Sequence, residues 1–124
     1  MVRVITAVSI LELVRAIFAE RDLEARQMVM DLHAFPQRFS DIPKPETADA
    51  EELVVAAALV ELFADRRGEA APAWTQQIGG FAQQRFLMGD PLRYPRFYAR
   101  CVAETPEPLK RRNLIAPRDY LTFA

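Results

Sequence analysis

Apolar residues recur with helical spacing over the first third of the chain. The first set follows the i, i+3, i+4 pattern of one helix face and comprises Ile10, Leu13, Val14, Ile17 and Phe18. Ser9 and Glu12 have capping-box spacing, which predicts a helix at about residues 7–20. Asp22 is suited to cap a second helix, whose apolar residues are Ala25, Met28, Val29, Leu32 and Phe35, and Pro36 is expected to end it.

The most apolar segment follows a proline-containing loop at 40–46. Asp49 and Glu52 repeat the capping-box spacing, and Leu53 through Phe63 is apolar except for Glu61. Gly68 is a typical helix terminator. Because a helix this apolar cannot be covered from one side alone, we predict that residues 49–67 form the central helix of the fold.

The remaining chain reads as short helices separated by proline and glycine. We expect a short helix after Pro72, stopped by Gly79 and Gly80, and a longer one from Pro95 to about Glu104. Thr105 is expected to cap a further helix that runs from Pro106 to about Asn113. Helical signals dominate, and no segment has a pattern that clearly predicts a strand. The predicted fold is a single compact all-α domain, residues 1–124, with five to seven helices around the central one.

Composition narrows the classes of protein to consider. The 124 residues are 51% apolar and 27% charged, which suits one globular domain. One cysteine and one histidine cannot supply an intramolecular disulfide or a zinc site, so we expect neither a metal nor a cofactor. The sequence has no apolar run near the roughly 20 residues of a membrane span and no secretory signal pattern. We therefore expect a cytoplasmic protein without membrane contact.

Candidate catalytic residues are few. His33, the only histidine, lies at the edge of an apolar helix face, where a packed imidazole is the expected reading. Cys101 lies in an apolar stretch and is expected to be a small core residue. Gly79 and Gly80 lack the Lys-Ser/Thr that completes a phosphate-binding loop. We predict that the protein is not an enzyme.

Charge is distributed unevenly along the chain. Residues 1–80 hold eight Lys/Arg and thirteen Asp/Glu, a net charge of −5, whereas residues 81–124 hold eight and four, a net charge of +4. Two basic clusters and two tyrosines are the predicted partner-binding residues: Arg93, Arg96, Arg100, Lys110, Arg111, Arg112, Tyr94 and Tyr120. The alternative for the basic residues is a solvated face, partly neutralised by the acidic part of the chain. For Trp74 and Tyr94, a place in the core is expected, with a role at an interface as the other possibility.

A resemblance adds to this picture. The segment Pro106-Glu107-Pro108-Leu109-Lys110-Arg111-Arg112-Asn113-Leu114-Ile115-Ala116-Pro117, followed by Tyr120-Leu121 and Ala124, resembles the C-terminal signature of small uncharacterised bacterial helical proteins. Members of that group tend to be encoded beside a second gene, often of nucleotidyltransferase-like or toxin type. The resemblance implies a partner encoded by a neighbouring gene and an antitoxin-like role.

The hypothesis from the sequence is a non-enzymatic bacterial interaction subunit that binds another protein, either a neighbouring gene product or a second copy of the chain. The alternative is a nucleic-acid-binding protein in which the helices after Pro95 and Thr105 form a helix-turn-helix. In that case the second helix would present Lys110, Arg111 and Arg112 to the duplex.

Overall fold

The computed structural model describes residues 7–34 and 38–122, without the side chains of Ala7, Val8, Ser9, His33 and Ala34. The predicted cap at Ser9, the side chain of His33, the helix end at Phe35 and Pro36, and Ala124 of the resemblance therefore lie outside the described residues. In chain order the elements are α1 (Ala7–Phe18), α2 (Asp22–Ala34), the 3-10 turn η1 (Phe39–Asp41), α3 (Ala50–Arg66), the 3-10 helix η2 (Ala73–Gln77), β1 (Arg85–Phe86), α4 (Pro95–Glu104), α5 (Glu107–Lys110) and β2 (Leu114–Ile115).

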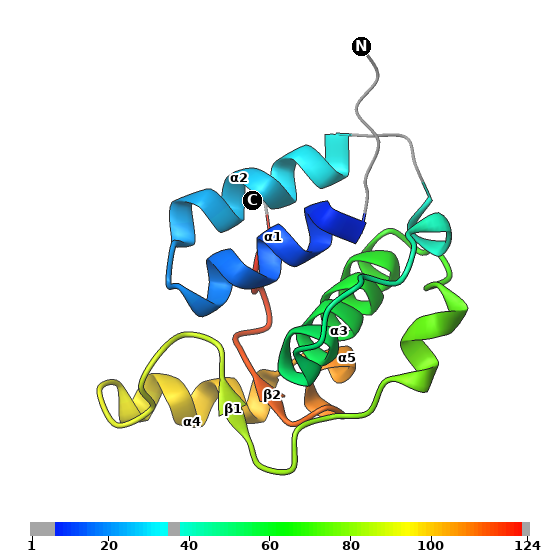
Figure 1. The fold of residues 1–124 in the computed structure, drawn as a ribbon. Coiled ribbons are helices and arrows are strands. Elements are labelled where there is room, and N and C mark those ends of the chain that lie inside the picture. The colour runs from blue at the N-terminus through cyan, green and yellow to red at the C-terminus, as the bar shows by residue number, and fades with distance from the viewer. Residues whose placement is uncertain (1–6, 35–37, 123–124) are drawn as a thin grey trace.

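Helices α1 and α2 form an antiparallel pair (Figure 1). The reversal occurs at Glu20, whose φ of 58° is in the left-handed region. The amide of Arg21 donates to the carbonyl of Ala16 at 2.9 Å, which closes the end of α1. This turn explains why α1 ends at Phe18 rather than at the predicted residue 20.

Helix α3 is buried along most of its length, with every residue from Val55 to Ala64 in the interior. Asp49 caps its start, because one carboxylate oxygen accepts from the amides of Glu51 and Glu52. Glu52 does not complete the predicted capping box. Its carboxylate instead accepts from Arg15 of α1 and from the Thr47 hydroxyl, so it joins α1 to α3. Gly68, with a φ of 68°, follows the end of the helix as expected.

Four other elements pack against α3: α1, η1, η2 and α5. Pro72 precedes η2, as the sequence predicts for this short helix. The Trp74 indole of η2 donates to the carbonyl of Ile42 at 2.8 Å, which fixes η2 to the loop after η1. Trp74 is partly buried against the main core, in agreement with its predicted place there.

The prediction that no strand forms is wrong in one place. β1 and β2 pair in parallel, with Arg85 opposite Leu114 and Phe86 opposite Ile115. Asn113 has a φ of 61°, so it takes the left-handed conformation expected of it and directs the chain into β2. A pair of two-residue strands has no periodicity of its own, and the pairing depends on this turn.

The strand β2 joins two apolar clusters. Leu114 lies in the main core with residues of α1, α2, α3 and α5, whereas Ile115 packs with Phe86 and Cys101 in a smaller cluster under α4. Helix α4 therefore lies beside β1 and β2, at the opposite end of the molecule from η1 in Figure 1.

The connection from α4 to α5 differs from the prediction. Pro106, not Thr105, stands at the N-cap of α5, and no side chain caps that helix. The Thr105 hydroxyl instead donates to the carbonyl of Cys101 at 2.5 Å and accepts from the amide of Ala116 at 3.3 Å. Thr105 thus ties the end of α4 to the segment after β2. The helix that follows has only four residues.

The predominantly helical class predicted from the sequence is confirmed. Within residues 7–34 and 38–122, no helix has both the length and the apolar character needed to cross a membrane.

Candidate functional site

Helix α4 has one buried and one exposed side. Pro95 occupies the first turn of the helix, where its missing N–H costs nothing. The buried side consists of Phe97, Tyr98, Cys101 and Val102, which pack on Phe86 and Ile115. This leaves the other side of the helix open to solvent.

In the first predicted basic cluster, Arg96 and Arg100 lie on α4 and Arg93 lies in the turn before it. Arg93, Arg96 and Arg100 are all exposed, and none has an ion-pair partner among the described residues. Two of them make cation–π contacts instead. The Arg93 guanidinium lies 5.8 Å from the Tyr94 ring centre, and the Arg100 guanidinium lies 5.4 Å from the Phe97 ring centre. In the described part of the chain, no acidic helix neutralises these three arginines.

Tyr94 does not lie in the core, so the expectation that placed it there is wrong. Its exposed fraction is 55%, and the neighbouring Leu92 is 86% exposed. Asp90 sets this turn, because its carboxylate accepts from the amide of Leu92 and its carbonyl accepts from the amide of Arg93. This turn, in the connection between β1 and α4, leaves the side chains of Leu92 and Tyr94 exposed to solvent.

The second predicted cluster is divided by the fold. Lys110 is exposed, and Arg111 is half-exposed with its guanidinium 2.5 Å from the Glu61 carboxylate. Arg112 is only 4% exposed, so its assignment to an exposed partner surface is wrong. It follows the last residues of α5 as the chain turns inward toward α3, and its guanidinium pairs with Glu61.

Arg112 joins four segments of the fold. Besides Glu61, its guanidinium donates to the carbonyls of Thr75 at 2.8 Å and Pro108 at 3.3 Å. Burial alone would raise the pKa of Glu61, but hydrogen bonds from Arg112 and Arg111 outweigh it and lower that pKa. The carboxylate is therefore kept charged inside the protein. In the sequence, Glu61 is the single polar residue of an otherwise apolar run. A carboxylate in such a run needs a cation beside it, but the sequence does not show that this cation is Arg112.

Tyr120 is also buried, with 6% of its surface exposed, and this corrects its assignment as an exposed anchor. It belongs to the turn after β2, where the amide of Tyr120 donates to the carbonyl of Pro117. Its ring packs in the main core. The C-terminal segment through Leu121 therefore packs on this chain.

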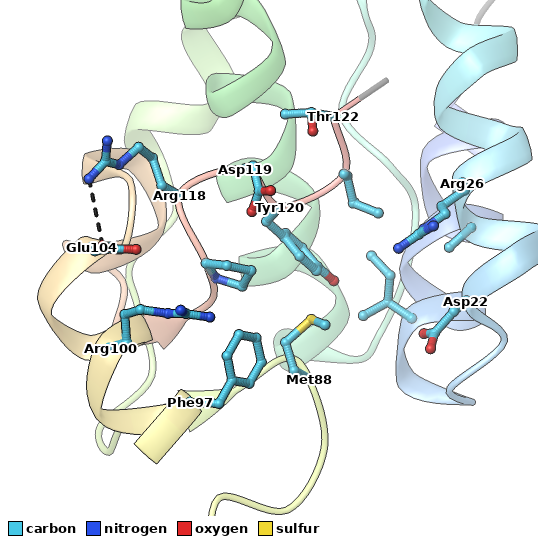
Figure 2. A pocket seen from close by; sticks show the side chains of 14 residues that line it. Asp22, Arg26, Met88, Phe97, Arg100, Glu104, Arg118, Asp119, Tyr120 and Thr122 are labelled. Carbon is cyan, nitrogen blue, oxygen red and sulfur yellow. Dashed lines mark ion pairs between the residues drawn. The ribbon is translucent and has the colours of Figure 1, made fainter. Parts of the chain in front are cut away.

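Tyr120 and Arg100 line one groove of about 770 Å³. Its walls come from the start of α2, from α4 and from the turn after β2 (Figure 2). Arg26, Asp22 and Arg118 also line it, and reasoning from the sequence missed all three. Asp22 and Arg26 are one turn apart on α2, but no spacing rule relates them to Arg118, which lies 92 positions after Arg26.

The described residues contain no cluster of three or more potential metal ligands. Cys101 is 1% exposed, and burial raises the pKa of its thiol. This confirms the expectation that Cys101 is a core residue.

Comparison with protein-family models, curated proteins and solved structures gives no match.

Proposed function

We propose that the protein is a non-enzymatic interaction subunit that binds an acidic surface of another protein through the α4 surface, defined as Leu92, Arg93, Tyr94 and Arg96. The observation that carries the proposal is the combination of unpaired arginines with outward apolar side chains. Leu92 is 86% exposed and Tyr94 is 55% exposed, beside two arginines without an ion-pair partner in the described chain.

Charge and chemistry support an acidic protein as the occupant. Arginine and tyrosine are enriched among the residues that dominate binding energy at protein interfaces. Arg93 and Arg96 have no ion-pair partner among the described residues, and carboxylates of a protein partner supply the missing charge compensation. Guanidinium groups also match carboxylates in paired hydrogen bonds, which gives the interface a defined orientation.

The neighbouring gene product, implied by the resemblance of the C-terminal segment, is the first partner to test. We expect the two proteins to copurify after co-expression and to bind in calorimetry with the purified components. A double substitution Arg93→Glu plus Arg96→Glu is expected to abolish binding, because it replaces attraction by repulsion at the centre of the surface.

A matched control carries the same charge change elsewhere. Arg38 immediately precedes η1 and Lys44 follows it, and both are exposed. Arg38→Glu plus Lys44→Glu is expected to retain binding, and both double variants are expected to melt near the parent temperature because exposed charges contribute little to stability. Equal loss of binding in both variants contradicts a specific α4 surface. A monomer that binds no neighbouring product contradicts the interaction proposal itself.

Nucleic-acid binding is the alternative to be separated. The second helix of the proposed helix-turn-helix has four residues, and Arg112 is turned inward, which leaves too little surface for groove reading. The α4 arginines nonetheless offer phosphate contacts. The test is binding to random duplex DNA. An affinity that falls steeply with salt and is lost in the double variant Arg93→Glu plus Arg96→Glu supports nucleic-acid binding.

A further inference from the structure

The groove beside α4 brings together two arginines from opposite walls. Arg26 of α2 and Arg100 of α4 extend toward each other across the opening, with Tyr120 between them (Figure 2). Neither arginine has an ion-pair partner among the described residues, whereas Arg118 lies 3.7 Å from Glu104. Phe97 supports the Arg100 guanidinium from below, at 5.4 Å from its ring centre.

Tyr120 supplies a polar group that the fold itself does not use. Its side chain is 94% buried, yet its hydroxyl points into the groove and forms no hydrogen bond with any described residue. Burial and the nearby charge of Asp22 raise the pKa of this phenol, so the hydroxyl keeps its proton. The hydroxyl is open to the groove, so an acceptor bound there can take its hydrogen bond.

The rest of the lining is mixed, because Asp22, Glu104, Arg118, Asp119 and Thr122 contribute polar groups beside several apolar side chains. Ile17, Met88, Phe97, Pro117 and Leu121 all contribute to the walls. A volume of about 770 Å³ is within the range of pockets that hold small organic molecules. In such a site the polar groups fix the orientation of the ligand and the apolar side chains cover its body.

We propose that this groove binds a small organic monoanion, a carboxylate carried on an apolar body. The carboxylate lies between Arg26 and Arg100 and accepts from the Tyr120 hydroxyl, and the apolar body covers Phe97, Met88 and Leu121. Asp22, Glu104 and Asp119 also line the groove, so a doubly charged anion such as phosphate meets stronger repulsion than a singly charged carboxylate does.

Phenylacetate is a suitable probe because it combines one carboxylate with one ring, and phenylacetamide is its neutral counterpart of the same shape. Titration of the full chain by calorimetry or by NMR is expected to detect phenylacetate binding. Phenylacetamide and inorganic phosphate are each expected to bind at least about tenfold more weakly, because one lacks the charge that the arginines recognise and the other carries too much.

Three substitutions assign the contacts. Arg26→Gln and Arg100→Gln are each expected to weaken phenylacetate binding about tenfold or more, since each removes a charge-assisted hydrogen bond. Tyr120→Phe keeps the ring in the core and is expected to weaken binding about threefold to tenfold. Arg26 and Arg100 are exposed, so their variants test the site even if Tyr120→Phe perturbs the fold.

Arg96→Gln is the matched control, because Arg96 lies on the same helix as Arg100 but does not line the groove. This variant is expected to leave the affinity for phenylacetate unchanged and to weaken binding of the protein partner. The ligand proposal for the groove and the partner proposal for the α4 surface can therefore be tested separately. The proposal is overturned if phenylacetate does not bind, if phenylacetamide or phosphate binds equally well, or if Arg96→Gln weakens phenylacetate binding as much as Arg100→Gln does.

Discussion

Glu61 on α3 and Arg112 after α5 form an ion pair in which both side chains are nearly inaccessible, with 6% and 5% exposed. The pair holds the basic C-terminal segment against the most buried helix of the fold. Arg112 also reaches the carbonyl of Thr75 in η2, so one guanidinium links three elements. Both groups are charged, and each depends on the other for compensation of its lost hydration.

Removal of Arg112 is expected to be far more harmful than removal of its neighbour. Arg112→Ala leaves a buried carboxylate with only the half-exposed Arg111 as partner and is expected to lower the free energy of unfolding by about 3–5 kcal/mol. Arg111→Ala, measured by the same urea titration, is expected to cost about 0–1 kcal/mol. Similar losses for the two variants contradict the internal role of Arg112.

Acid is expected to destabilise the protein through Glu61. The pKa of Glu61 is lower in the folded protein than its ordinary value of 4.5. Its stabilisation is therefore fully present above pH 4.5 and is lost as the pH falls through the lowered pKa, because the unfolded chain takes up the proton more readily. Urea unfolding of the parent and of Glu61→Gln between pH 7 and pH 3 measures this, and the difference in stability between the two is expected to shrink toward acid.

The adjacent glycines Gly80 and Gly79 differ in the space around them, so the same substitution at each one tests how closely the chain packs at Gly80. A Cβ at Gly80 would lie 2.6 Å from the Cα of Arg112, whereas a Cβ at Gly79 meets nothing within 4 Å. Gly80→Ala must displace backbone and is expected to cost about 1–3 kcal/mol. Gly79→Ala is expected to change stability by less than about 0.5 kcal/mol. Thermal denaturation of the two variants side by side checks the expectation, and equal melting temperatures contradict it.

Leu59 and Leu92 offer the same substitution in opposite environments. Leu59 is fully buried in the main core, and Leu92 is 86% exposed. Leu59→Ala is expected to cost about 2–5 kcal/mol through lost burial and the cavity that remains. Leu92→Ala is expected to leave the unfolding midpoint within error of the parent while it weakens binding of the protein partner.

The thiol of Cys101 is expected to react slowly in the native protein. Burial raises its pKa, which lowers the fraction of reactive thiolate, and the small cluster under α4 shields it from reagents. Labelling with a chromogenic disulfide at pH 8 is expected to become fast only in denaturant. Rapid labelling of the native protein contradicts the packing of α4 on β2.

The sequence alone determined the helices whose signals are local. Pro95 marks the start of α4, and its spaced apolar residues mark its buried side, so the predicted bounds agree with Pro95–Glu104. The apolar run from Leu53 to Phe63 likewise predicted a helix covered on several sides, and α3 is buried from Val55 to Ala64. In these segments, residues within a few turns of one another carry enough information.

The tertiary structure alone decided which charged and aromatic residues face solvent. Lys110, Arg111 and Arg112 are adjacent and similar in the sequence, yet only Arg112 is buried. The reason is that its guanidinium pairs with the carboxylate of Glu61, which lies 51 positions earlier on α3. The groove likewise joins Arg26, Arg100 and Tyr120, whose separation along the chain leaves no periodic trace. Local patterns report what a segment can form, whereas burial of a charge depends on the partner that the fold brings to it.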